Sequence, residues 1–128
     1  MKTFTGLNIQ YPISQLILEG KKIIETRTYP LPQKYLGKEL VIIETPGKDG
    51  DFESRIVGII KFDECFKYRN KEEFYGDKTK HFVLPDSPWR WSDRKPKWGW
   101  KISYLRVFKH PKIAPKKKGI VYTKDIKI

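Results

Sequence analysis

Residues 11–27 constrain the fold of this 128-residue chain more than any other stretch, because they combine helix, stop and strand signals. Pro12 suits the first position of a helix, where its missing N–H group loses no hydrogen bond. Apolar side chains then recur at helical spacing up to Gly20, and glycine suits a left-handed C-terminal cap. The sequence therefore predicts a short helix that ends at Gly20 and leads directly into a strand.

The predicted strand carries charges of both signs in the form G-x-K-x-x-E-x-R, at Gly20, Lys22, Glu25 and Arg27. Side chains alternate between the two faces of a strand, so Glu25, Arg27 and Tyr29 share one face. An acid, a base and an aromatic ring are unusual on a core face and typical of the wall of a polar cleft. A structural Glu–Arg ion pair is the alternative, and the spacing alone leaves it open.

The remaining pattern predicts a mainly β fold. Alternation and apolar runs predict strands over residues 3–9 and 39–45 and a last short strand at 120–123. A second short helix is predicted at 69–76, with an N-cap at its start and a glycine at its end. Residues 77–97 are predicted to be a long irregular segment that covers one side of the cleft.

This order of elements resembles the ASCH domain (activating signal cointegrator homology), a family of the PUA-like superfamily. Besides the charged motif, the resemblance rests on Pro12, Tyr29, Gly37, the strand Leu40–Thr45, the segments Ile56–Cys65 and Gly99–Ile102, and the ending from His110 to Gly119. It implies an α+β, mainly β fold, a PUA-like β pseudobarrel with two or three short helices. We expect a single domain over residues 1–128, with the basic segment 109–128 packed on it or trailing from it.

The formal net charge of +12 indicates an anionic partner, and phosphate backbones are the usual one. Residues 109–128 hold seven lysines against one acid, and Lys116, Lys117 and Lys118 are consecutive. Lysine suits phosphate contacts better than the bidentate recognition of bases. A solvated, lysine-rich surface without a partner is the alternative interpretation.

All four tryptophans lie within residues 89–100, interleaved with Arg and Lys. Such a pattern suits a nucleic-acid site, because the rings stack on bases while the cations contact phosphates. Trp89 and Trp91 lie in a Pro-bounded loop, where contact with a ligand is expected of one of them. Trp100 is expected in the core or at the floor of the cleft.

The single cysteine, Cys65, has no internal disulfide partner, and the chain shows neither a signal peptide nor an apolar run long enough to span a membrane. These features predict an intracellular, cytoplasmic location without membrane contact.

Two histidines and one cysteine do not support a zinc site, and phosphate-loop and dinucleotide motifs are missing. We therefore expect neither a metal nor a cofactor; His81 is a candidate for proton transfer.

The resemblance first implies binding of RNA or another single-stranded nucleic acid, including a modified nucleotide. Lys22 would then meet a phosphate or a base oxygen, while Glu25 and Arg27 line or brace the cleft. Tyr11, Tyr29 or a tryptophan would stack on a base, and the C-terminal lysines would follow the backbone.

The alternative is a small hydrolase, either a ribonuclease or an amidohydrolase that acts on a modified nucleoside. In the amidohydrolase branch the lysine of G-x-K acts with a threonine three residues later, but that position is Glu25 here, and Thr26 is expected on the opposite side of the strand. Glu25 would instead activate water and Lys22 stabilise negative charge, with Glu44 as a second carboxylate. A third possibility is a transcription coactivator-type adaptor, which the sequence does not separate from RNA binding.

Overall fold

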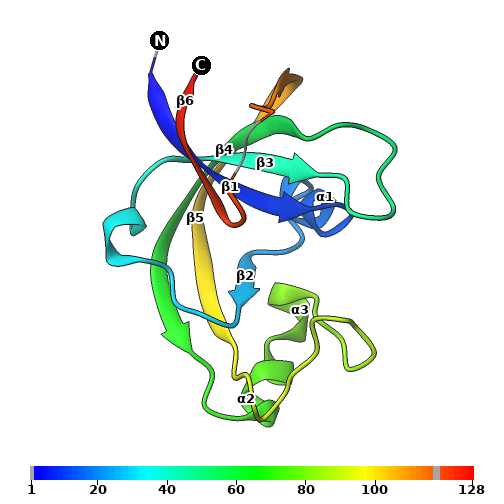
Figure 1. The fold of residues 1–128 in the computed structure, drawn as a ribbon. Coiled ribbons are helices and arrows are strands. Elements are labelled where there is room, and N and C mark those ends of the chain that lie inside the picture. The colour runs from blue at the N-terminus through cyan, green and yellow to red at the C-terminus, as the bar shows by residue number, and fades with distance from the viewer. Residues whose placement is uncertain (1, 117–118) are drawn as a thin grey trace.

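The computed structural model describes residues 2–116 and 119–128, which form a twisted six-stranded mixed sheet with short helices beside it (Figure 1). The strands are β1 (Thr3–Gln10), β2 (Ile24–Arg27), β3 (Leu40–Thr45), β4 (Arg55–Lys67), β5 (Trp98–Ile113) and β6 (Tyr122–Lys127). The helices are α1 (Ile13–Leu18), α2 (Lys71–Gly76) and α3 (Lys78–His81), with one 3₁₀ turn, η1 (Gln33–Tyr35).

The strand order is β2-β5-β4-β3-β1-β6. The pair β1–β3 is parallel, and the other four pairs are antiparallel. The short β2 and the C-terminal β6 are the two edges, so the sheet formed by the described residues is open. The prediction of an α+β, mainly β fold with two or three short helices is confirmed, but the predicted pseudobarrel is not closed into a barrel.

Both faces of the central strand β3 are covered. Its side chains alternate between two apolar clusters, one containing Ile42 and the other containing Val41 and Ile43. Because a strand buried on both faces reads as a continuous apolar run, this explains the pattern at residues 39–45. The first cluster also contains Trp100, which has no exposed surface. Trp100 is therefore a core residue, one of the two positions expected for it.

The junction from α1 to β2 forms as predicted. Helix α1 ends at Leu18, and Gly20 follows in the left-handed region with a φ of 77°. The backbone N–H of Lys22 then donates to the carbonyl oxygen of Leu16 at 3.0 Å, which turns the chain towards β2. Glycine adopts this conformation without the steric strain that a β-carbon brings, so Gly20 fixes where the charged strand begins.

The second predicted helix is also present, and a third helix follows it. The Asn70 side chain caps α2 by accepting a hydrogen bond from the backbone N–H of Glu73 at 2.8 Å. Helix α3 lies inside the predicted irregular segment, and its Lys80 carbonyl oxygen accepts from the N–H of Ile23 at 2.8 Å, just before β2. None of the described helices is long and apolar enough to cross a membrane.

Two strands differ in extent from the prediction. The segment Gly99–Ile102, on which the resemblance rests in part, belongs to the much longer strand β5, which continues to Ile113 because it pairs with β4 along its length. The last strand begins at Tyr122 rather than at residue 120 and runs to Lys127 along β1. Both ends of the segment 109–128 therefore belong to the sheet.

Glu44, the proposed second carboxylate, is a buried structural link rather than an exposed acid at a strand end. It accepts hydrogen bonds from Ser14 Oγ at 2.5 Å, Gln15 Nε2 at 2.6 Å and Arg55 Nε at 2.8 Å. Burial raises the pKa of Glu44, but these hydrogen bonds and the Arg55 charge outweigh burial and hold it below its usual range. Glu44 thus joins α1 to β3 and β4.

We expect Glu44→Gln to lower the free energy of unfolding by about 2–3 kcal/mol, because the amide nitrogen would face a donor and the charge would be lost. The matched control is Glu39→Gln, whose side chain is 37% exposed and 3.8 Å from Lys2; it should change stability by less than about 0.5 kcal/mol. Urea unfolding at neutral pH measures both. Equal small losses in the two variants would contradict the assignment of Glu44 as a structural link.

Candidate functional site

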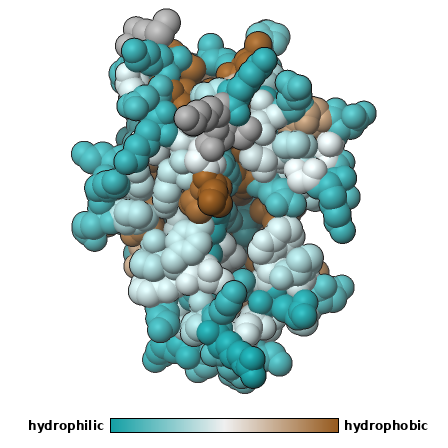
Figure 2. All heavy atoms as spheres, in the orientation of Figure 1, coloured by the Kyte–Doolittle hydropathy of each residue, from teal (hydrophilic) through white to brown (hydrophobic). Residues whose placement is uncertain are grey.

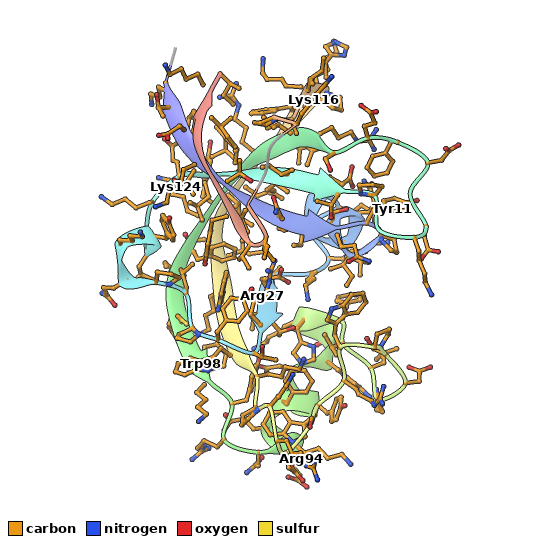
Figure 3. The ribbon with its side chains drawn as sticks, in the orientation of Figure 1. Tyr11, Arg27, Arg94, Trp98, Lys116 and Lys124 are labelled. Carbon is orange, nitrogen blue, oxygen red and sulfur yellow. The ribbon has the colours of Figure 1, made fainter. Side chains whose placement is uncertain are left out.

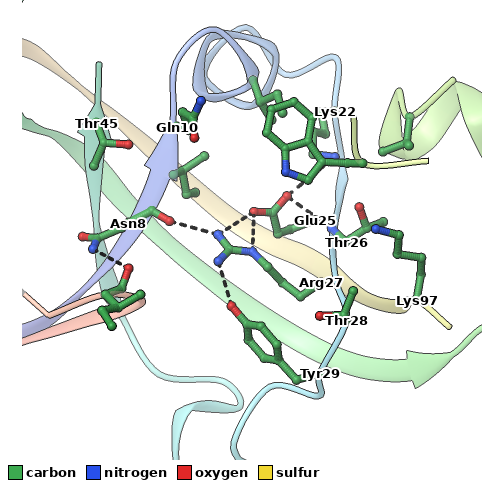
Figure 4. Close-up of a pocket in the computed structure, with 15 residues that line it drawn as sticks. Asn8, Gln10, Lys22, Glu25, Thr26, Arg27, Thr28, Tyr29, Thr45 and Lys97 are labelled. Atoms are coloured by element: carbon green, nitrogen blue, oxygen red, sulfur yellow. Dashed lines mark hydrogen bonds and ion pairs between the residues drawn. The ribbon is translucent and has the colours of Figure 1, made fainter. Parts of the chain in front are cut away.

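Arg27 gathers the acid and the aromatic ring of the motif at one place (Figure 4). Its Nε and Nη2 donate to Oε2 of Glu25 at 3.1 and 2.9 Å, and its Nη1 donates to the Tyr29 hydroxyl at 3.1 Å. Nη2 also donates to the carbonyl oxygen of Asn8 in β1 at 2.9 Å. The guanidinium lies 5.5 Å from the ring centroid of Trp100. The edge strand β2 is thereby joined to β1 and to the core.

The Glu25 carboxylate is almost fully buried, with 6% of its side chain exposed. Besides the two bonds from Arg27, its Oε1 accepts from the N–H of Thr26 at 3.2 Å and lies 3.6 Å from Lys22 Nζ. Three hydrogen bonds and one ion pair thus act on the two oxygens, close to the four hydrogen bonds that an ionised carboxylate can accept. Burial raises the pKa of Glu25, but the charges of Arg27 and Lys22 and the hydrogen bonds outweigh it and hold the pKa below its usual range.

Lys22 is as deeply buried as its partner, with 2% of its side chain exposed. Its ammonium donates to the carbonyl oxygen of His81, the last residue of α3, at 2.5 Å. Burial lowers the pKa of Lys22, and the charge of Glu25 offsets this only in part. Lys22 therefore connects the motif to α3.

His81 is held by the backbone on both sides of its ring. Nε2 lies 2.6 Å from the carbonyl oxygen of Phe74, and Nδ1 accepts from the N–H of Val83 at 2.9 Å. This pairing assigns the neutral tautomer with its proton on Nε2, and burial lowers the pKa of His81. The geometry gives His81 a structural role and does not support its candidacy for proton transfer.

A cavity of about 380 Å³ opens beside these residues, between the ends of β1, β2 and β3 and the segment 83–97 (Figure 4). Its charged lining consists of three cations, Lys22, Arg27 and Lys97, and one carboxylate, Glu25. The volume lies within the range of about 300–1,000 Å³ that is usual for small-ligand sites. The cavity therefore suits a polar ligand that carries negative charge.

Uncharged polar residues contribute a further part of the lining, namely Asn8, Gln10, Thr26, Thr28, Tyr29 and Thr45. Apolar and aromatic residues complete it, namely Ile9, Ile13, Val83, Trp89 and Ile120. Thr26 contributes to this lining, although alternation along the strand predicted that it would lie on the opposite side. Within the described ranges, no group of three or more His, Cys, Asp or Glu side chains is arranged to hold a metal ion.

The predicted aromatic residues take different positions. Trp89 lines the cavity with 39% of its surface exposed, whereas Trp91 lines a neighbouring cavity. Trp100 lies beneath the site, where its Nε1 donates to the carbonyl oxygen of Tyr29 at 3.3 Å. The structure places Tyr11 outside the cavity, and its ring packs edge-on against another aromatic ring 5.4 Å away.

Of the predicted basic residues of the C-terminal segment, Lys116 does not line the cavity, although Ile120 of the same segment does. Figure 3 shows Lys116 near the end of the molecule that carries both termini, Arg94 at the opposite end and Arg27 between them. Lys117 and Lys118 lie outside the described residues. Glu44 is also absent from the cavity lining, so the structure does not bring it together with Glu25.

Lys97 belongs to the basic stretch between the tryptophans, but its position in the same cavity as the charged motif was not predicted; it is only 6% exposed. It directly precedes β5, and the first residue of β5, Trp98, pairs with Arg27 of β2. Only this pairing brings Lys97 to the motif, because the two segments are far apart in sequence. Gln10 and Thr45 were missed for the same reason, since they meet at the end of the parallel pair β1–β3.

A search of protein-family models and of curated proteins found no match for this chain. Among solved structures, the chain is similar to a serine-to-alanine mutant of an ASCH protein from Zymomonas mobilis, with a TM-score of 0.67 and 14% identity over 96% of this chain and 88% of that chain. A second structure of ASCH from Zymomonas mobilis has a TM-score of 0.61 and 14% identity over 80% of this chain and 68% of that chain. The resemblance to the ASCH domain is thereby confirmed at the level of the fold.

We expect Glu25→Gln to lower the free energy of unfolding at neutral pH by about 3–5 kcal/mol, because it leaves two buried cations without a counter-charge. The pKa of Glu25 is lower in the folded protein than in the unfolded chain. Its contribution is therefore complete above about pH 4.3, the ordinary value, and is lost as the pH falls through the folded value.

Urea unfolding of both proteins across the acidic range measures this difference, which should shrink below about pH 4.3. Glu64→Gln is the control, because Glu64 is more than half exposed and its ion pair with Lys101 is also exposed. A stability difference that stays constant down to strongly acidic pH would contradict an ionised Glu25 at the centre of the site.

Proposed function

We propose that this protein, whose fold is that of the ASCH domain, binds RNA or another single-stranded nucleic acid, with one nucleotide in the cavity beside Lys22, Glu25 and Arg27. The observation that carries the proposal is the charge of the cavity lining, three cations against one carboxylate. Because the carboxylate is already matched by Arg27 and Lys22, the remaining positive charge favours a phosphate-bearing ligand.

The other lining groups suit the remainder of a nucleotide. Amide and hydroxyl groups of Gln10, Thr28 and Thr45 can exchange hydrogen bonds with the edges of a base, which present both donors and acceptors. The partly exposed ring of Trp89 offers a face on which a base can stack. Hydrophilic residues cover most of the face seen in Figure 2, and the net charge of +12 adds a long-range attraction for polyanions.

The geometry favours binding over hydrolysis. A general base needs a free lone pair and a pKa near the working pH. The Glu25 oxygens are occupied by donors from Arg27, Thr26 and Lys22, and the pKa of Glu25 is lowered. The second carboxylate of the hydrolase hypothesis, Glu44, is bound elsewhere. The adaptor function gains no separate support from the cavity, and the cytoplasmic location stays a prediction.

Fluorescence anisotropy with a labelled single-stranded RNA of about ten nucleotides tests the proposal. We expect the affinity of the wild type to fall between about 50 and 200 mM salt, because binding releases counterions. Lys22→Met should weaken binding about tenfold or more, with circular dichroism confirming that the variant is folded. A gel of the same RNA should show that it stays intact.

Lys101→Met is the matched control, because it removes the same charge from β5 at a residue outside the cavity with 47% of its side chain exposed. Equal binding by wild type and Lys22→Met, with a loss in Lys101→Met, would contradict the proposal and indicate only surface attraction. Cleavage of the RNA by the wild type but not by Lys22→Met would make the protein a hydrolase.

A further inference from the structure

A second cavity, of about 460 Å³, adjoins the first on the loop that precedes β5. It is lined by Thr28, residues 88–92, Lys95 and Lys97. Thr28, Trp89 and Lys97 line both cavities, so the two spaces share a boundary. The two cavities therefore lie next to each other, with these three residues between them.

The second cavity has a stronger positive character than the first. Its charged lining consists of Arg90, Lys95 and Lys97, and none of the described lining residues is acidic. The neighbouring Asp93 does not line this cavity, and its carboxylate accepts a hydrogen bond from the indole N–H of Trp91 at 2.8 Å. The chemistry of this space therefore matches an anion.

Lys97 stands at the boundary in a positive environment. Burial lowers the pKa of Lys97, and the positive charges of Lys22 and Lys95 lower it further. Among the ion pairs of the described residues, none joins a carboxylate to the Lys97 ammonium. A buried ammonium that faces two other cations is unfavourable unless an anion is bound beside it.

The two tryptophans of this loop are held differently. Trp91 is fixed, since its ring packs 5.6 Å from that of Phe74 and its backbone N–H donates to the Tyr75 hydroxyl at 3.1 Å. Trp89 is tied through its backbone N–H to Ser87 Oγ at 3.1 Å, and its ring stays partly exposed at the boundary. One ring thus forms a rigid wall, and the other offers an accessible face.

We propose that the second cavity is a subsite for the neighbouring nucleotide of a single strand, with the phosphodiester held by Lys97 at the boundary and the second base against Trp89 or Trp91. This inference rests on the proposed function and deepens it, because it defines the ligand as an oligonucleotide of at least two nucleotides. In this arrangement the nucleic-acid strand runs over the loop at 88–97 and away from the C-terminal lysines. Arg90 and Lys95 would contact the next phosphate.

Competition against the labelled RNA distinguishes the ligand classes. The competitors are a mixture of ribonucleosides, a mixture of 5′-nucleoside monophosphates and a mixture of 3′–5′ ribodinucleoside monophosphates. We expect the dinucleotides to compete at concentrations about tenfold or more below those of the other two, because stacking and the phosphodiester contact are added. Effective competition by nucleoside monophosphates at the same concentration would overturn the subsite for a second nucleotide.

Lys97→Met should remove most of the advantage of dinucleotides and lower the salt dependence of RNA binding by about 0.7 in log–log slope, the share of one phosphate. Trp89→Leu should weaken dinucleotide competition about fivefold or more. Lys95→Met gives a second charge variant at an exposed residue of the same cavity, where folding is not at risk. Lys101→Met serves as the control and should keep the advantage of dinucleotides.

The outcomes separate this inference from the proposed function. If the wild type does not bind RNA, or binds as well after Lys22→Met, the proposed function itself fails. If RNA binding depends on Lys22 but Lys97→Met and Lys95→Met behave like Lys101→Met, the proposed function stands and the subsite is overturned. If nucleosides compete as well as dinucleotides, the ligand occupies the first cavity alone, which also overturns the subsite.

Discussion

The buried carboxylate of Glu25 is the interaction on which the site depends. It pairs with both Arg27 and Lys22 and offsets one of their two positive charges; without it, both cations would lie in the interior with no counter-charge. Through Arg27 the edge strand β2 is tied to β1 and to the ring of Trp100, and through Lys22 it is tied to α3. A four-residue strand at the edge of a sheet has few backbone bonds of its own, so this network fixes its position. Gly20 completes the arrangement by turning the chain into the strand.

The contacts of Glu25 also determine which chemistry the cavity offers to a ligand. A carboxylate that already accepts three hydrogen bonds and lies beside two cations holds these cations in place, and their remaining N–H groups can donate to a ligand. Lys97 adds a charge that no described acid balances, at the boundary with a second positive cavity. This excess of positive charge beside aromatic rings is the basis of our proposal that the two cavities bind a phosphate-bearing nucleic-acid strand.

Much of the fold was predictable because local patterns specify it, whereas the site was predictable only in part. Period-two alternation correctly placed Glu25, Arg27 and Tyr29 together, and the helix signals around Gly20 gave α1. Helix α3 was missed because four residues are too few to show helical periodicity. The sequence showed Lys97 within a basic stretch but not beside the motif, because it reaches the motif only through pairing between distant strands. Conversely, Glu44 and Tyr11 were assigned to the predicted site, whereas hydrogen bonding to α1 and packing against another aromatic ring fix them elsewhere.

The central proposal is that the nucleic-acid strand binds in the two cavities and not along the C-terminal lysines. Two-dimensional ¹H–¹⁵N spectra of the labelled protein, recorded during titration with single-stranded RNA, test it most directly, because the signals of both regions are read in one experiment. The account predicts that the indole signal of Trp89 and the backbone signals of Thr28 and Lys97 shift first and together, while those of Lys124 and Lys127 stay in place. Shifts confined to the C-terminal segment, with the signals of the cleft unchanged, would contradict it.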